Sequence, residues 1–95
     1  MSAGEAILLD QADQVATVLR TVQPGETVVI STPDGERHVV AREVIPMCHK
    51  IAMTSLSAGS DVVKYGETIG ILIADVEEGA LIHLHNLRSK RALKA

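Results

Sequence analysis

Thr27-Val28-Val29-Ile30 and His38-Val39-Val40-Ala41 flank the turn residues Pro33-Asp34-Gly35, and this stretch determines the expected fold. β-branched residues favour extended strands, and Pro-Asp-Gly supplies the backbone angles of a tight turn. We therefore predict a β-hairpin over residues 27–41 and a mainly β fold. Shorter apolar segments, separated by glycines, continue the pattern at Ile51-Ala52-Met53, Val62-Val63, 68–73 and 81–84.

One short helix is predicted before this hairpin. Asp10 is a good helix N-cap, Asp13 adds a second carboxylate in the first turn, and Pro24-Gly25 ends the pattern. Between them, apolar residues recur at the spacing i, i+3, i+4, i+7, which places them on one helix face. These residues are Val15, Val18, Leu19 and Val22.

Three later turns show a weak similarity to one another. Gln23-Pro24-Gly25-Glu26, Ser57-Ala58-Gly59-Ser60 and Glu77-Glu78-Gly79-Ala80 each precede an apolar strand. The similarity is too loose to predict a repeat.

The composition predicts one small domain with a light core. The 95 residues are 46% hydrophobic but contain neither Phe nor Trp. A chain of this length buries only roughly 60 to 65% of its unfolded surface. We expect one domain over residues 1–95 that gains stability from a permanent partner and self-associates when isolated.

Several classes of function are excluded by charge and hydropathy. The net charge is −3 and no basic patch is interleaved with aromatic residues, so a nucleic-acid partner is not expected. No apolar run approaches the roughly 18 residues of a spanning helix, so we expect a cytoplasmic protein without a membrane partner. Cys48 is the only cysteine, which excludes an internal disulfide and a multi-thiolate zinc site.

Polar side chains gather at the ends of the apolar segments in the second half of the chain. They are His49-Lys50, Lys64-Tyr65-Gly66 and His83-Leu84-His85-Asn86. An apolar core needs none of these groups, and the single aromatic residue of the chain, Tyr65, lies among them. Ammonium groups, imidazoles and one phenol together indicate a site for an anion or a sugar acid.

These segments carry a resemblance to a known family. In order along the chain, they resemble the SAF-type small domain of the altronate and galactarate dehydratase family. Where the family usually has Gly before the His-Lys pair, this chain has Cys48. The segments are Ile45-Pro46, His49-Lys50-Ile51-Ala52, 63–70, Asp75-Val76 and His83-Leu84-His85-Asn86-Leu87.

The resemblance implies a β-clip fold and a place in a lyase that eliminates water from a hexonate to give a 2-keto-3-deoxy acid. It also implies a large catalytic subunit, with this chain as the small subunit, inactive alone. The same small-subunit architecture occurs in sulfolactate sulfo-lyase. A divalent metal, iron or manganese, would then be held mainly by the large subunit.

The chemistry of such eliminations suggests roles for the polar residues. Removal of a proton α to a carboxylate needs positive charge beside the developing enediolate. We predict His49 and His85 as catalytic residues and His83 with His85 as metal ligands, because side chains two apart in a strand face the same side. Structural histidines are the alternative. The predicted substrate-binding residues are Lys50, Lys64, Tyr65 and Asn86.

Two other functions remain open at this point. The chain could be a stand-alone sugar-acid-binding module or an assembly module without catalysis. The basic tail over residues 88–95 is either solvated or docks onto the large subunit.

Overall fold

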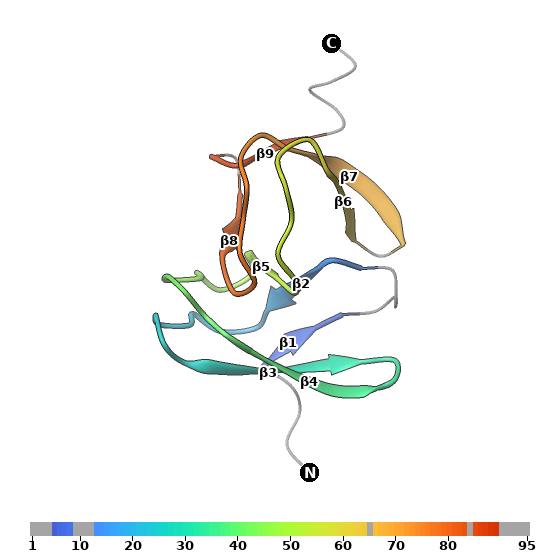
Figure 1. Cartoon of the computed structure of the whole chain (residues 1–95). Coiled ribbons are helices and arrows are strands. Elements are labelled where there is room, and N and C mark those ends of the chain that lie inside the picture. Colours follow the sequence, from blue (N-terminus) through green and yellow to red (C-terminus); the bar gives the residue numbers. More distant parts are fainter. Residues whose placement is uncertain (1–4, 9–12, 65, 84, 90–95) are drawn as a thin grey trace.

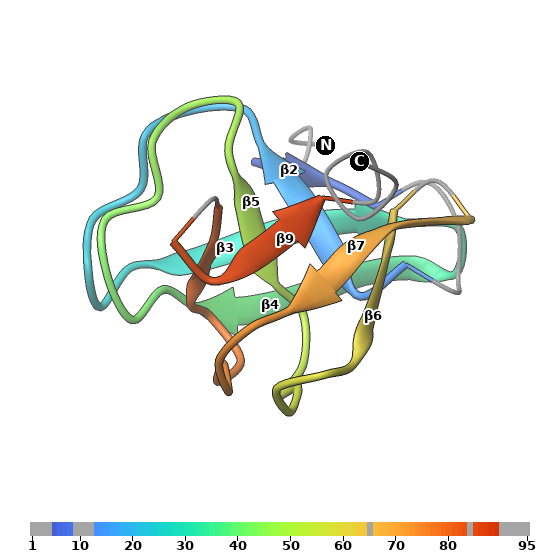
Figure 2. The same ribbon diagram turned by 90° about the horizontal axis from the view of Figure 1, so that it is seen from above.

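The computed structural model describes residues 5–8, 13–64, 66–83 and 85–89. These residues form nine strands and no helix, so none could cross a membrane as a helix. Six strands make one sheet in the order β4-β3-β1-β2-β5-β8, and three make a second in the order β6-β7-β9 (Figures 1 and 2). The strands are β1 (Ala6–Ile7), β2 (Val15–Val18), β3 (Thr27–Thr32), β4 (Gly35–Val40), β5 (Lys50–Ala52), β6 (Asp61–Lys64), β7 (Glu67–Leu72), β8 (Leu81–Ile82) and β9 (Leu87–Ser89).

The prediction of a mainly β fold is confirmed, and so is the hairpin. β3 and β4 pair antiparallel from Thr27 opposite Val40 to Thr32 opposite Gly35. At the turn, the Thr32 hydroxyl donates to the Gly35 carbonyl at 2.7 Å and accepts from the Asp34 N–H at 3.2 Å. Local turn chemistry therefore closes this hairpin as expected.

The predicted helix is wrong in its described part, because Val15–Val18 forms strand β2. β2 pairs with β1 on one side and β5 on the other. Val15 packs in one core and Val18 in another, so both faces of this strand are covered. A strand that is buried on both faces has a nearly continuous run of apolar residues. Here that run also matched the apolar spacing expected for a helix. Asp10, the predicted N-cap, lies outside the described residues.

The two cores lie on opposite faces of β2 and β5. The first core is formed by side chains from all five strands β1 to β5 and includes Val18, Ile30 and Ile51. The second core fills the space between the two sheets and includes Ala52, Val62, Leu72 and Ile82.

The weak similarity between turns proves to be a structural repeat. Four segments within the described ranges share one plan, which we call the paired-turn unit. Each begins with the last residue of a strand (Val18, Ala52 or Leu72) or with the residue just after one (Ala41). It reaches an isolated β-bridge four residues later (Val22, Ile45, Leu56 or Val76) and continues into a four-residue turn before the next strand. The third turn residue has a positive φ in every unit, at Gly25, Cys48, Gly59 and Gly79.

The units form two reciprocal pairs, joined by the bridges Val22–Ile45 and Leu56–Val76. In the first pair, the Gly25 N–H donates to the Ala41 carbonyl at 2.8 Å, and the Cys48 N–H donates to the Val18 carbonyl at 2.9 Å. The second pair repeats this pattern, from Gly59 to Leu72 and from Gly79 to Ala52. Each turn thus donates a hydrogen bond to the first carbonyl of its partner unit, which lies at or just beyond a strand end.

A side chain caps the second residue of three of these turns. Thr21 Oγ1 accepts from the Met47 N–H at 3.1 Å, Asp75 Oδ1 from Ala58 at 2.7 Å and Ser55 Oγ from Glu78 at 3.3 Å. In the remaining turn the second residue is Pro24, which has no N–H, and the position equivalent to Thr21 is Val44. This turn therefore lacks both the backbone N–H donor and the side-chain acceptor.

We predict that Thr21→Val lowers the free energy of unfolding by about 1 kcal/mol, because the Met47 N–H loses its acceptor. Met47→Pro in the Thr21→Val background should recover much of that loss by recreating the combination found at Pro24 and Val44. Urea denaturation of the two single variants and the double variant measures the coupling. Strictly additive changes in the free energy of unfolding would show that the Thr21 hydroxyl and the Met47 N–H are not coupled.

Cys48 is the only described residue other than glycine with a positive φ, at 68°. A side chain in the left-handed region costs roughly 1 to 2 kcal/mol. Cys48→Gly should therefore raise the free energy of unfolding by about 1 kcal/mol. Thermal and urea denaturation check this, with Gly79→Ala as the opposite control, because a Cβ there would meet the Val40 carbonyl.

Candidate functional site

Lys50 and Lys64 both lie on the side of their strands that faces the second core. Lys50 lies two residues before Ala52 in β5, and Lys64 lies two residues after Val62 in β6. Ala52 and Val62 both belong to the second core, so strand alternation turns the two lysines toward that side. The charge of Lys64 acts on Lys50. We call these two residues the lysine pair.

The electrostatic environment of Lys50 is unfavourable for its own charge. Burial lowers the pKa of Lys50 below its ordinary value, and the positive charge of Lys64 lowers that pKa further. Ion pairs among the described residues involve Arg20 and Arg42 but not Lys50. An anion held near the lysine pair would offset both effects.

Thr17 adds a polar group that sequence reasoning missed. It lies opposite Lys50 in the β2–β5 register and shares its strand face with Val15 of the second core. Its Oγ1 is buried and has no hydrogen-bond partner. Buried hydroxyls are nearly always hydrogen-bonded, so an unpaired hydroxyl at this position is unusual. A threonine inside an apolar strand gives no signal beyond β propensity.

Asp13 is a second residue whose role was misread. It was expected in the first turn of a helix, yet its Oδ1 accepts from the Gly66 N–H at 2.8 Å. Asp13 is 6% exposed, and its Oδ2 is buried without a hydrogen-bond partner. Asp13 therefore anchors the β6–β7 turn just beyond Lys64. Tyr65, the predicted substrate-binding phenol, lies outside the described residues.

His49 and His83 form a pair of their own at the end of the β5–β8 ladder. Lys50 pairs with Ile82, and the two histidines lie one residue beyond this pair, His49 just before β5 and His83 just after β8. Their ring centroids are 4.8 Å apart, with the ring planes tilted by 60°. His49 Nδ1 lies 3.1 Å from the Met47 carbonyl, to which it donates. The ladder thus brings two predicted site residues together next to Lys50.

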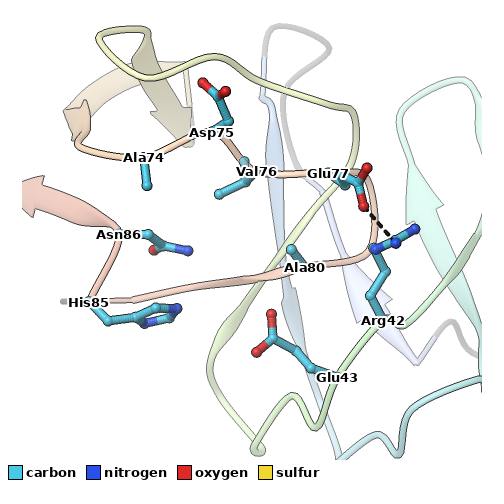
Figure 3. Close-up of a pocket in the computed structure, with 9 residues that line it drawn as sticks. All are labelled: Arg42, Glu43, Ala74, Asp75, Val76, Glu77, Ala80, His85 and Asn86. Atoms are coloured by element: carbon cyan, nitrogen blue, oxygen red, sulfur yellow. Dashed lines mark ion pairs between the residues drawn. The ribbon is translucent and has the colours of Figure 1, made fainter.

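His85 lies elsewhere, in an open pocket of about 710 Å³ that is drawn in Figure 3. Glu43, Asp75 and Glu77 bring three carboxylates to its lining, against the single guanidinium of Arg42. Arg42 is paired with Glu77 at 2.6 Å, and Glu43 Oε2 accepts from the Leu81 N–H at 3.0 Å. This pocket is acidic and repels an anionic substrate.

The shared strand expected for His83 and His85 is wrong, because β8 ends at Ile82 and His83 opens a turn. Asn86 holds that turn: its Oδ1 accepts from the His83 N–H at 2.9 Å, and its Nδ2 donates to the Leu81 carbonyl at 2.7 Å. Asn86 as a whole is 6% exposed. Substrate binding by Asn86 stays a prediction, beside this observed structural role.

The described residues do not form a metal site by themselves, since no group of three or more His, Cys, Asp or Glu side chains is arranged to hold an ion. Metal ligation by His83 and His85 therefore stays a prediction. Of the basic tail, Arg88 lies in β9, and residues 90–95 are outside the described part.

We predict that Lys64→Met raises the pKa of Lys50, while burial still keeps that pKa below its ordinary value. The free energy of unfolding should rise with pH as Lys50 loses its proton, because folding weakens proton binding there. This rise should be smaller in the variant. NMR titration of the Lys50 side chain tests the shift, with Arg37→Met on distant β4 as the control for net charge. An unchanged Lys50 pKa in Lys64→Met would show that the pair is not coupled.

Comparison with known proteins confirms the resemblance seen in the sequence. A family model described as the altronate/galactarate dehydratase SAF domain matches residues 4–90. The alpha subunit of (2R)-sulfolactate sulfo-lyase from Paracoccus pantotrophus is 38% identical over 63 residues, which are 66% of this chain and 94% of that subunit. Altronate dehydratase from Escherichia coli is 32% identical over 83 residues, which are 87% of this chain but 16% of that enzyme. The chain therefore belongs to the family of altronate/galactarate dehydratase SAF domains.

Proposed function

We propose that this chain is the small subunit of a lyase of the altronate/galactarate dehydratase type, which eliminates water from a hexonate to give a 2-keto-3-deoxy acid. The family match over residues 4–90 carries the proposal. The coverage of 94% of the sulfo-lyase alpha subunit supports a separate subunit, with a large catalytic subunit as its partner. We further propose a β-clip fold, supported by the short strands in two packed sheets, and a cytoplasmic location.

The lysine pair is the part of the chain that we assign to substrate binding. A substrate carboxylate between Lys50 and Lys64 would gain charge-assisted hydrogen bonds and relieve the repulsion that Lys50 experiences. His49, next to Lys50, is the candidate for proton transfer, because its Nδ1 is held by a carbonyl and its Nε2 remains for a substrate.

His85 has a different role in this proposal. The carboxylates around it favour contact with positive groups, so we assign it to the surface that faces the large subunit. A divalent metal such as iron or manganese would polarise the substrate in the assembled enzyme. Because the described residues do not form a metal site, its ligands would come mainly from the large subunit.

A sulfo-lyase small subunit is the second candidate. The specific observation in its favour is that the match covers nearly the whole Paracoccus pantotrophus alpha subunit at 38% identity. Both eliminations remove a proton α to a carboxylate while a group leaves from the β carbon. The lysine pair would hold that carboxylate in either reaction.

Purification of the chain with its large subunit tests the proposal directly. The isolated chain should show no activity on altronate, galactarate or sulfolactate, and the two-subunit complex should convert one of them. Robust turnover by the chain alone would contradict this assignment. A chain that never joins a lyase subunit would instead be a stand-alone binding or assembly module.

In the active complex, Lys64→Ala should lower kcat/KM about 10- to 150-fold, the equivalent of about 1.5 to 3 kcal/mol for a lost charged hydrogen bond. Subunit assembly, measured by size-exclusion chromatography, should be unchanged. Arg37→Ala is the matched control. If His85→Ala instead separates the subunits while activity per remaining complex is unchanged, the interface role of His85 is supported.

A further inference from the structure

His49 is held both through its backbone and through its ring. Its N–H donates to the Pro46 carbonyl at 3.0 Å, and its carbonyl accepts from the Val18 N–H at 3.0 Å. Its ring donates from Nδ1 to the Met47 carbonyl and packs against the ring of His83. A histidine side chain has only two torsions, so these two ring contacts leave it few orientations.

The carbonyl that accepts from Nδ1 is fixed with the help of Thr21. Met47 lies between two peptide groups. The following group contains this carbonyl and the Cys48 N–H, which donates to the Val18 carbonyl at 2.9 Å. The preceding group contains the Met47 N–H, which donates to Thr21 Oγ1 at 3.1 Å. Thr21 therefore contributes a side chain to holding the acceptor of His49.

The ring that packs against His49 is held in place by Asn86. Asn86 Oδ1 accepts from the His83 N–H at 2.9 Å, and the Asn86 backbone N–H donates to the His83 carbonyl at 3.0 Å. Its Nδ2 donates to the Leu81 carbonyl at 2.7 Å, which ties the turn to β8. Both ends of this buried amide are therefore used to hold His83 beside the ladder.

We propose that Thr21 and Asn86 are positioning residues for His49. The inference rests on the proposed function, in which His49 transfers a proton. A carbonyl that accepts from Nδ1 keeps the proton on that nitrogen and leaves the lone pair on Nε2, where a base needs it. The packed imidazole of His83 keeps that lone pair pointing in one direction. Thr21 acts through the carbonyl, and Asn86 acts through the packed imidazole.

Nuclear magnetic resonance on the isolated chain tests the positioning without any activity. At about pH 8.5, where an ordinary imidazole is neutral, nitrogen-15 shifts report which ring nitrogen of His49 carries the proton. The wild-type chain should carry it on Nδ1 and show proton–proton contacts between the rings of His49 and His83. Thr21→Val should reduce the population of this tautomer, and Thr21→Ser should restore it. Ser55→Ala is the matched control, because it removes the equivalent cap in the second pair of turns.

The Asn86 variants report on the contact between the rings. Asn86→Ala should remove the proton–proton contacts between His49 and His83. Asn86→Asp keeps an acceptor for the His83 N–H, so it should retain those contacts, and it carries the test if Asn86→Ala does not fold. Loss of the contacts in Asn86→Asp would contradict a role for this hydrogen bond.

Kinetics of the active complex then separate positioning from substrate binding. Thr21→Val and Asn86→Ala should each lower kcat about 10- to 100-fold, because a misplaced catalytic group can cost about 100-fold. KM should stay nearly unchanged. Thr21→Ser and Asn86→Asp should recover most of the loss, and Ser55→Ala should have no effect. If Asn86 binds the substrate directly, Asn86→Ala would instead raise KM.

The outcomes distinguish this inference from the proposed function. An unchanged tautomer and unchanged ring contacts in the variants, or a raised KM with kcat retained, would overturn the inference. So would kinetic losses that Ser55→Ala shows equally. If the variants alter the ring of His49 while kcat is unaffected, Thr21 and Asn86 still position His49, and the proposed proton transfer by His49 fails.

Discussion

The reciprocal hydrogen bonds between turns and strand ends are the constraint on which the rest of this structure depends. The described strands are short, between two and six residues, and the second core contains no aromatic side chain. Short strands leave many backbone groups at their ends, and each must find a partner. The paired-turn units supply those partners, so they bring the ends of distant strands together and determine which strands become neighbours.

The position of the lysine pair follows from this arrangement. The turn at residues 57–60 leads into β6, and the turn at residues 46–49 leads into β5. Because both turns are held by hydrogen bonds to residues at or just beyond other strand ends, Lys50 and Lys64 have defined positions on the side that faces the second core. The histidine pair is positioned by the same β5 turn, at which His49 is the last residue.

Charge is divided between two regions of this small domain. The lysine pair concentrates positive charge beside an apolar core, and the pocket around His85 concentrates carboxylates. One region suits an anionic substrate and the other suits a positively charged partner surface. A net charge of −3 does not reveal this division, because it sums over both regions.

The sequence by itself determined the β class, the hairpin at Pro33-Asp34-Gly35 and the family, because strand propensity, turn chemistry and an ordered motif are local properties. Only the tertiary structure decided that Val15–Val18 is a strand, since burial on both faces depends on neighbours far along the chain. It also separated His85 from His83 and assembled Thr17 with the lysine pair, because strand register brings together residues whose distance in sequence carries no signal. Cross-strand pairing, rather than local spacing, therefore created the candidate site.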